Sequence, residues 1–407
     1  MSVPKLRFKE FSEDWGSKKI IELADYVDYR GKTPKKVESG VLLVTAKNIK
    51  QGYLDYSASQ EFIEESAFDD VMRRGKVELN DVLITTEAPL GNVASVDRTD
   101  IALAQRVIKY RGKSALLDNL FLKQKFLSES FQEILKSKAT GGTVQGIKGS
   151  VLHQIPLIVP SKAEQTKIAT FLSAVDEKIS QLTQKHQLLS QYKQGMMQKL
   201  FSQQIRFKAD NGSEFGEWES KKISDLFDEV RNKVADRDIE TYSITAGKGF
   251  VSQANKFGRD ISGKQNSNYI VLKPNDFSYN KGNSKTYKYG CVYLNELNYD
   301  IAVPNVFISF RSKKLNLVHE KFYSKLFEFH YLDKYLRLLI SSSARMDGLL
   351  NVSKDGFFEI KLPYPCLEEQ TKIANFLSAI DQKIEVTSQQ IEQAKQWKKG
   401  LLQQMFV

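Results

Sequence analysis

One sixteen-residue motif occurs twice in this 407-residue chain, and the repeat limits the folds that the sequence can adopt. Residues 164–179 read EQTKIATFLSAVDEKI, and residues 369–384 read EQTKIANFLSAIDQKI, 205 positions later. The offset continues without a gap to Phe201 and Phe406. An internal repeat of this length indicates two copies of one structural unit in a single chain. The chain is also too long for one ordinary core, so two or more domains are expected.

Both copies carry apolar residues at heptad spacing, which is typical of paired helices. A narrow apolar stripe cannot bury itself alone, so the simplest partner for each helix is the other one. Each helix should run for about 40 residues, or about 60 Å if it is unbroken. The predicted helix-pair interface comprises Ile168, Leu172, Val175 and Ile179 in the first copy and Ile373, Leu377, Ile380 and Ile384 in the second.

The starts of the two predicted helices differ in their capping residues. Ser161 and Glu164 form an S-x-x-E capping box, in which the hydroxyl and the carboxylate satisfy open backbone N–H groups. The second helix has Cys366 and Glu369 at these positions, so a weaker cap is expected.

Five residues inside the helical pattern interrupt it. His186, Lys193 and Lys398 fall on inward positions, where polar side chains set the register between helices. Gly195 and Gly400 should each cost about 1 kcal/mol relative to alanine. We therefore expect a helix end or bend at each glycine, the alternative being the close approach of another backbone.

A shorter repeat lies next to the predicted helices. Residues 6–9 (LRFK) and 15–20 (WGSKKI) are echoed by residues 205–208 (IRFK) and 218–223 (WESKKI). In the middle of the chain, the first helical repeat runs directly into residues 205–208. The second helical repeat ends at the C-terminus, and the matching residues 6–9 lie at the N-terminus. A chain built in this way should have pseudo-twofold, circular organisation, with its two ends close together.

Two variable segments, at about 28–160 and 231–365, separate the shared parts, and each has ordinary domain size. Both predict an α/β fold with strands first, then a helical stretch, a glycine-containing loop and a short strand that ends in proline. The motif DIA recurs at 100–102 and 300–302, yet the loops hardly match. One framework is therefore expected to carry two different surfaces.

Charge points to a polyanionic partner. The net charge of +11 and the pI near 9.2 favour binding through counterion release, although a solvated lysine-rich surface is the alternative. No apolar run approaches the ~18 residues of a membrane span, and the N-terminus does not look like a secretory signal. Two cysteines fit a reducing, cytoplasmic location.

Signatures of enzymes fail. The glycine-rich loop at 139–150 has Ile147 where a phosphate-binding loop needs lysine. No dinucleotide fingerprint follows a strand, and no aspartate or asparagine precedes the double proline and aromatic residue of amino-methyltransferases. The four histidines are scattered. No catalytic or metal-binding residue is therefore predicted.

Basic loops in the variable segments are the best candidates for DNA contacts. Residues 136–150 and 278–290 contain no acid, and they combine lysines with polar or aromatic side chains, although solvated hairpin turns are the alternative. Arginines elsewhere could pair with guanine. The candidate DNA-binding residues are Arg30, Lys32, Lys35, Lys36, Lys138, Thr143, Gln145 and Lys148 in the first segment, and Lys248, Lys256, Arg259, Lys264, Lys281, Lys285, Tyr287, Lys288, Arg345 and Lys354 in the second.

Taken together, the paired EQTKIA-FLSA-DxKI helices, the tails ending in LF and MF, and the (L/I)RF segments with downstream tryptophans resemble the specificity subunit of type I restriction-modification systems. The resemblance covers essentially the whole chain. It implies a non-catalytic subunit whose two target recognition domains each bind half of a bipartite, asymmetric sequence in double-stranded DNA. The two helices would pack as an antiparallel intramolecular coiled coil and measure the spacer.

The resemblance also implies partners and a domain plan. Two modification subunits would methylate adenine N6 with S-adenosylmethionine, and restriction subunits would use ATP and magnesium, so no cofactor is expected on this chain itself. No membrane partner is expected either, because no apolar run is long enough to span a bilayer. The expected parts are an N-terminal segment (1–27), recognition domain 1 (28–160), a central helix (161–203), a repeat of the opening (204–230), recognition domain 2 (231–365) and a C-terminal helix (366–407). Alternatives are a self-contained DNA methyltransferase or nuclease, or a coiled-coil adaptor.

Overall fold

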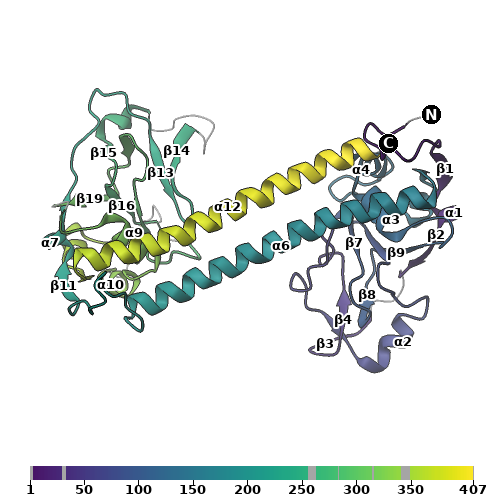
Figure 1. Cartoon of the computed structure of the whole chain (residues 1–407), viewed down its shortest axis with the longest axis horizontal. Helices are drawn as coiled ribbons and strands as arrows, with labels where there is room; N and C mark the ends of the chain where they lie inside the picture. The colour runs from purple at the N-terminus through teal and green to yellow at the C-terminus, as the bar shows by residue number, and fades with distance from the viewer. Residues whose placement is uncertain are drawn as a thin grey trace. The chain divides into compact units, whose positions relative to one another are not determined.

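The computed structural model describes residues 3–29, 34–254, 263–282, 284–313, 316–340 and 349–406. The chain forms two compact units: unit 1 contains residues 1–184 and 387–407, and unit 2 contains residues 185–386. Two long helices, α6 (Lys162–Phe201) and α12 (Leu367–Met405), each contribute one segment to unit 1 and one to unit 2 (Figure 1). The predicted alternation of α/β segments with two long helices is confirmed.

Unit 1 contains a four-stranded antiparallel sheet in the order β2-β9-β6-β7 and a second sheet in the order β3-β5-β4-β8, in which β4 and β8 are parallel. A short ladder pairs β1 with β10. The elements are β1 (Gly16–Lys19), α1 (Ile20–Leu23), β2 (Ala24–Asp28), β3 (Lys36–Val37), β4 (Val41–Val44), β5 (Phe62–Ile63), η1 (Glu65–Ala67), α2 (Phe68–Val71), β6 (Val82–Thr86), β7 (Leu90–Ser95), β8 (Ile101–Leu103), β9 (Val107–Gly112), α3 (Asn119–Leu127), α4 (Glu129–Ser137), α5 (Gly149–Leu152) and β10 (Pro156–Val159).

Strand β6 shows why the first sheet is the centre of unit 1. All five of its residues are buried, because the sheet is covered on both faces. Val82 and Ile84 belong to the core shared with α3, α4 and α6, whereas Leu83, which points the other way, belongs to the core shared with the second sheet.

Unit 2 has the same main sheet, in the order β12-β19-β16-β17, and a ladder that pairs β11 with β20. Two further pairs, β15-β18 and β13-β14, are present. The elements are β11 (Glu219–Lys222), α7 (Ile223–Leu226), β12 (Phe227–Glu229), β13 (Tyr242–Thr245), β14 (Gly249–Ser252), η2 (Gly263–Asn268), β15 (Ile270–Leu272), β16 (Phe277–Asn280), β17 (Cys291–Leu294), β18 (Ile301–Val303), β19 (Ile308–Ser312), α9 (Glu320–Glu328), α10 (Asp333–Leu339), α11 (Lys354–Phe358) and β20 (Lys361–Tyr364).

The eight residues of the predicted helix-pair interface divide between two cores. Ile168, Leu172, Val175 and Ile179 pack in unit 1 with Leu401, Met405 and Phe406 from the end of the chain. Ile373, Leu377, Ile380 and Ile384 pack in unit 2 with Met197, Leu200 and Phe201. Within each unit, the start of one long helix therefore shares a core with the end of the other and with the α/β domain. The two sets of four do not share a core with each other.

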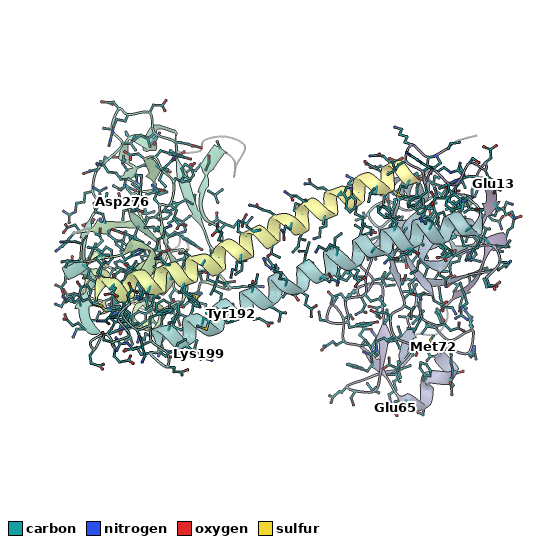
Figure 2. The ribbon with its side chains drawn as sticks, in the orientation of Figure 1. Glu13, Glu65, Met72, Tyr192, Lys199 and Asp276 are labelled. Atoms are coloured by element: carbon teal, nitrogen blue, oxygen red, sulfur yellow. The ribbon has the colours of Figure 1, made fainter. Side chains whose placement is uncertain are left out.

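A buried glutamate ties the start of α6 to the opening segment of the chain. Glu164, whose side chain is 1% exposed, accepts two hydrogen bonds of 2.8 Å from Arg7 and one of 3.4 Å from the indole of Trp15. Arg7 also donates to the carbonyl of Glu13, labelled in Figure 2, and its hydrogen bond with Glu164 raises the pKa of its guanidinium. The predicted capping box is therefore only half present: Ser161 accepts from the Glu164 N–H at 3.4 Å, but the carboxylate is used by Arg7 and Trp15.

The same tie recurs at the start of α12. Glu369, fully buried, accepts from Arg206 at 3.0 and 2.8 Å and from the indole of Trp218 at 2.9 Å. The repeated arginine, tryptophan and glutamate of the sequence thus form two equivalent clusters, one in each unit.

The glutamine that follows each glutamate holds the backbone around it. Gln165 donates to the carbonyls of Leu116 and Pro160 and accepts from the N–H of Asp118. Gln370 makes the matching bonds to Leu317, Pro365 and His319. Together these glutamines fasten α6 and α12 to the end of the preceding strand and to the loops that lead into α3 and α9.

Lys193 and Lys398 pair with aspartates of the other long helix. In unit 1, Lys398 Nζ lies 2.6 Å from Asp176, which also contacts Lys123 of α3. Burial raises the pKa of Asp176, but the two lysines outweigh it and the net shift is downward, so the carboxylate stays ionised. In unit 2, Lys193 Nζ lies 2.5 Å from Asp381. These reciprocal pairs agree with the predicted role of the lysines in register, whereas His186 is only half-buried.

The expected helix end at Gly195 and Gly400 is wrong, because α6 and α12 run through both positions. The alternative fails too: a Cβ at either glycine would have no non-local atom within 4 Å. Buried neighbours such as Met197 and Leu401 stabilise the helices there, and this packing outweighs a local cost of about 1 kcal/mol.

Substituting Glu369 by alanine should destabilise unit 2 by about 3 kcal/mol, because Arg206 and Trp218 would lose their partner inside the protein. The matched control is Glu368→Ala, one residue earlier, since Glu368 is exposed and its ion pair with Lys372 spans 3.9 Å; it should cost under about 0.5 kcal/mol. Chemical denaturation measures both. An equal loss in the free energy of unfolding for the two variants would show that the buried cluster of Glu369, Arg206 and Trp218 does not stabilise unit 2.

Gly400→Ala should stabilise the chain by up to about 1 kcal/mol, because the helix continues through Gly400 and the new methyl group meets no atom. Gly91→Ala is the opposite case: its φ is +80° and a Cβ would lie 2.6 Å from Gln132 and 2.8 Å from Leu135, so stability should fall. Thermal unfolding of the two variants tests this. A loss of stability in Gly400→Ala would contradict the continuous helix.

Candidate nucleic-acid interface

In unit 1, three loops meet at one end of the main sheet. The β6-β7 hairpin, the turn between β8 and β9, and the loop after α4 all lie there. Thr86 bonds to the carbonyl of Arg106 in the turn and accepts from the N–H of Ile147 in the loop, and Glu87 bridges Gly146. The loop closes on itself through two backbone bonds between Thr140 and Gly146, at 2.8 and 2.9 Å.

This loop end carries polar and cationic side chains around a hollow of about 300 Å³. Arg106 and Glu87 form an ion pair at its edge, with Nε and Oε1 2.7 Å apart. The lining residues are Thr86, Glu87, Gln105, Arg106, Thr140, Val144, Gly146, Ile147 and Lys148. The side chains of this surface can donate hydrogen bonds to a nucleic acid.

Four predicted contact residues of the first domain gather on this loop. Lys138, Thr143, Gln145 and Lys148 are all exposed. Among the described residues, no carboxylate lies within ion-pair distance of Lys138 or Lys148, so their charges are available to phosphates.

Unit 2 has the equivalent loop end with different chemistry. The β16-β17 connection is long, from Lys281 to Gly290, and Gly282 bridges Leu349 as Glu87 bridges Gly146 in unit 1. Lys281 is a structural residue, because its ammonium donates to the carbonyl of Val352 and its own carbonyl accepts from Leu350. Its side chain is therefore less available to DNA than the sequence suggested.

The tip of the β16-β17 connection presents lysines. Lys285 and Lys288 are exposed, and no described carboxylate pairs with either. Tyr287 is half-buried, and its ring lies 4.8 Å from that of His330, so it supports the tip. Lys248 is exposed in the β13-β14 turn and lines a hollow of about 410 Å³ together with Tyr293 and Lys325.

Three predicted contact lysines are already paired with acids. Lys35 Nζ lies 3.7 Å from Glu64, and Lys36 Nζ lies 2.7 Å from Glu61. Lys36 pairs with Ile63, which in turn pairs with Val41 at the start of β4. The turn that carries Arg106 follows β8, whose last residue lies beside the last residue of β4. Lys36 therefore lies at the opposite end of the second sheet from that turn. Lys354 Nζ lies 2.5 Å from Glu229.

The remaining predicted contacts have no described side chain. Arg30, Lys32, Lys256, Arg259 and Arg345 lie outside the described residues, as does the side chain of Lys264. Within the described part of the chain, no group of three or more His, Cys, Asp or Glu residues is close enough to hold a metal ion. No described helix is long and apolar enough to cross a bilayer.

Sequence reasoning missed two kinds of residue. Asp81 and Asp276, each after an asparagine with positive φ, bind Arg111 and Arg311 at the opposite end of the two main sheets. Asp276 is labelled in Figure 2. The dipeptide Asn-Asp in both variable segments was a signal for this shared feature. Arg106 was missed because it belongs to no motif. Aligning the two DIA motifs places Arg106 opposite Val306, and this difference was the available signal.

A family model described as "Type I restriction modification DNA specificity domain" matches the chain twice, over residues 12–191 and 216–396. The type I restriction enzyme MjaVIII specificity subunit of Methanocaldococcus jannaschii is 26% identical over 420 residues, covering 96% of this chain and 91% of the relative. The MjaIX specificity subunit of the same organism is 26% identical over 231 residues, covering 53% of this chain and 52% of that protein.

A solved structure agrees in fold. The crystal structure of a type I restriction-modification S subunit from M. genitalium aligns over 100% of this chain and 99% of its own, with a TM-score of 0.62 and 18% identity. The two matches of the family model together cover most of the sequence, one on each variable segment with its helix. The chain therefore belongs to the family of type I restriction-modification DNA specificity proteins.

Proposed function

We propose that this chain reads a bipartite, asymmetric sequence in double-stranded DNA, one half-site with each unit. The observation that carries the proposal is the contrast between the two loop ends. Both stand on the same sheet order, yet unit 1 presents Arg106 and the loop with Lys138 and Lys148, whereas unit 2 presents Lys285 and Lys288. Two unlike readers in one chain fit a non-palindromic site, whereas a symmetric dimer fits a palindrome.

We assign residues 28–160 and 231–365 to the two recognition domains and the long helices to a spacer that sets the distance between them. The reciprocal pairs Asp176–Lys398 and Asp381–Lys193 support an antiparallel coiled coil with pseudo-twofold symmetry. Circular closure is supported within unit 1, where the N–H of Leu6 bonds to the carbonyl of Gln404 at 2.9 Å. The N-terminal segment (1–27) would then follow the end of α12 in space, as residues 204–230 follow the end of α6 along the chain.

Chemistry would come from partner subunits. We propose two modification subunits that methylate adenine N6 with S-adenosylmethionine, and restriction subunits that use ATP and magnesium. The twofold repeat supports two equivalent docking positions. Exposed aromatic side chains occur at matched positions of the two helices, Tyr192 (labelled in Figure 2) at 51% and Trp397 at 55% exposure. A self-contained methyltransferase and a coiled-coil adaptor are not favoured by the family to which the chain belongs.

The exposed lysines of unit 2 should contribute to the salt dependence of DNA binding. For the complex of this chain with its modification subunit, Lys285→Ala with Lys288→Ala should reduce the slope of log K against log salt by about two, because two phosphate contacts are lost. Lys221→Ala, in β11 and ion-paired with Glu219, is the control and should leave the slope unchanged. Fluorescence anisotropy at several salt concentrations measures the slopes. An unaltered slope in the double variant would remove this tip from the interface.

The spacer role predicts the effect of lengthening both helices. Adding one heptad after Lys185 in α6 and one after Val386 in α12 lengthens the pair by about 10 Å, which corresponds to about three base pairs. The spacer between the half-sites should grow by up to that amount while the half-sites stay the same, as read by sequencing methylated genomic DNA. A heptad in α6 alone is the control, since it breaks the register with α12. Changed half-sites with an unchanged spacer would refute the spacer role.

A further inference from the structure

Arg106 has a backbone that an arginine rarely adopts. It ends the turn between β8 and β9 with a φ of +71°, in the left-handed region. Its carbonyl accepts two hydrogen bonds from Thr86, one from the N–H at 2.9 Å and one from the hydroxyl at 3.3 Å. Strand β6 therefore fixes the turn, and local strain of this kind tends to persist at functional positions.

The Arg106 side chain is oriented by an acid that is itself held in place. Arg106 and Glu87 are 55% and 41% exposed, and their contact uses Nε of the guanidinium. Glu87 bridges Gly146, and a Cβ at Gly146 would lie only 3.2 Å from the Cβ of Glu87, so the glycine makes room for the acid. Among the described residues, no acceptor bonds to the Nη atoms of Arg106, which leaves those donors for a ligand.

The framework does not require an arginine in this turn. The segments DIAL (100–103) and DIAV (300–303) end with β8 and β18, and a turn follows each strand. At the same distance along the chain, Val306 of unit 2 occupies the position of Arg106. Val306 is 47% exposed, and its turn is closed by a bond from the Phe307 N–H to the Pro304 carbonyl. The same framework position thus carries unlike side chains in the two units.

We propose that Arg106 is a specificity-determining residue of unit 1 that contacts a guanine in double-stranded DNA through its Nη atoms, while Glu87 holds the side chain in place. This inference rests on the proposed function. A carboxylate beside the guanidinium weakens attraction to a phosphate, since it repels that anion, but leaves the donors suited to the uncharged O6 and N7 acceptors of guanine. Lys148, across the same hollow, lacks such an acid and fits a phosphate contact.

The test compares Arg106→Gln with Arg98→Gln in the complex of the full chain with its modification subunit. Arg98 is a matched control, because it is 48% exposed and also paired with an acid, Asp100, but it precedes β8. Sequencing of methylated genomic DNA gives the motif of each variant. Arg106→Gln should relax or change one guanine in one half-site and leave the other half-site intact, and Arg98→Gln should leave both intact.

Duplexes with single base substitutions keep the test decisive if methylation is lost. Replacing the critical guanine should weaken binding of the wild-type complex about tenfold or more and should not weaken binding of Arg106→Gln. If the variant discriminates this base as the wild type does, or loses affinity for all duplexes equally, Arg106 does not read a base and the inference is overturned. If the wild-type complex itself shows no motif and no sequence preference, the proposed function fails instead.

Discussion

Each long helix depends on one buried carboxylate at its first turn. Glu164 and Glu369 each bind an arginine and a tryptophan from a segment about 150 residues earlier in the chain. Because removing a buried charge from its partner costs several kcal/mol, this contact fixes how the helix leaves its domain. The neighbouring glutamines then hold the backbone of the strand before the helix and of the loop beside it. These two clusters therefore set the directions in which both helices leave their domains.

A fixed framework leaves the loop ends free to differ. In both main sheets an aspartate of the central strand region binds an arginine of the neighbouring strand, so one end of each sheet is locked in the same way. At the opposite end, the described parts of the loops share a backbone bridge, Glu87–Gly146 in unit 1 and Gly282–Leu349 in unit 2. Backbone bonds constrain position but not side-chain identity. This separation explains how one fold carries Arg106 in one unit and Val306 in the other.

The repeat in the sequence predicted the two helices, the two α/β segments and the family, because apolar spacing and duplicated motifs can be read directly from the order of the residues. Long-range partners were not predictable in this way. The pattern around Ser161 and Glu164 indicated a local capping box, but Arg7, far away in sequence, takes the carboxylate. The prediction at Gly195 rested on local propensity, which packing overrides. Lys35, Lys36 and Lys354 were counted as available charges, yet each has an acidic neighbour that only the fold reveals.

We propose that a single chain carries two different readers of DNA and sets the spacer between their half-sites. Sequencing the methylated DNA of a host that carries this chain with its modification subunit tests the claim most directly. The account predicts one bipartite motif with two unlike half-sites, a spacer of constant length, and loss of the motif when the chain is deleted. A continuous or palindromic motif, or methylation that persists without this chain, would contradict it.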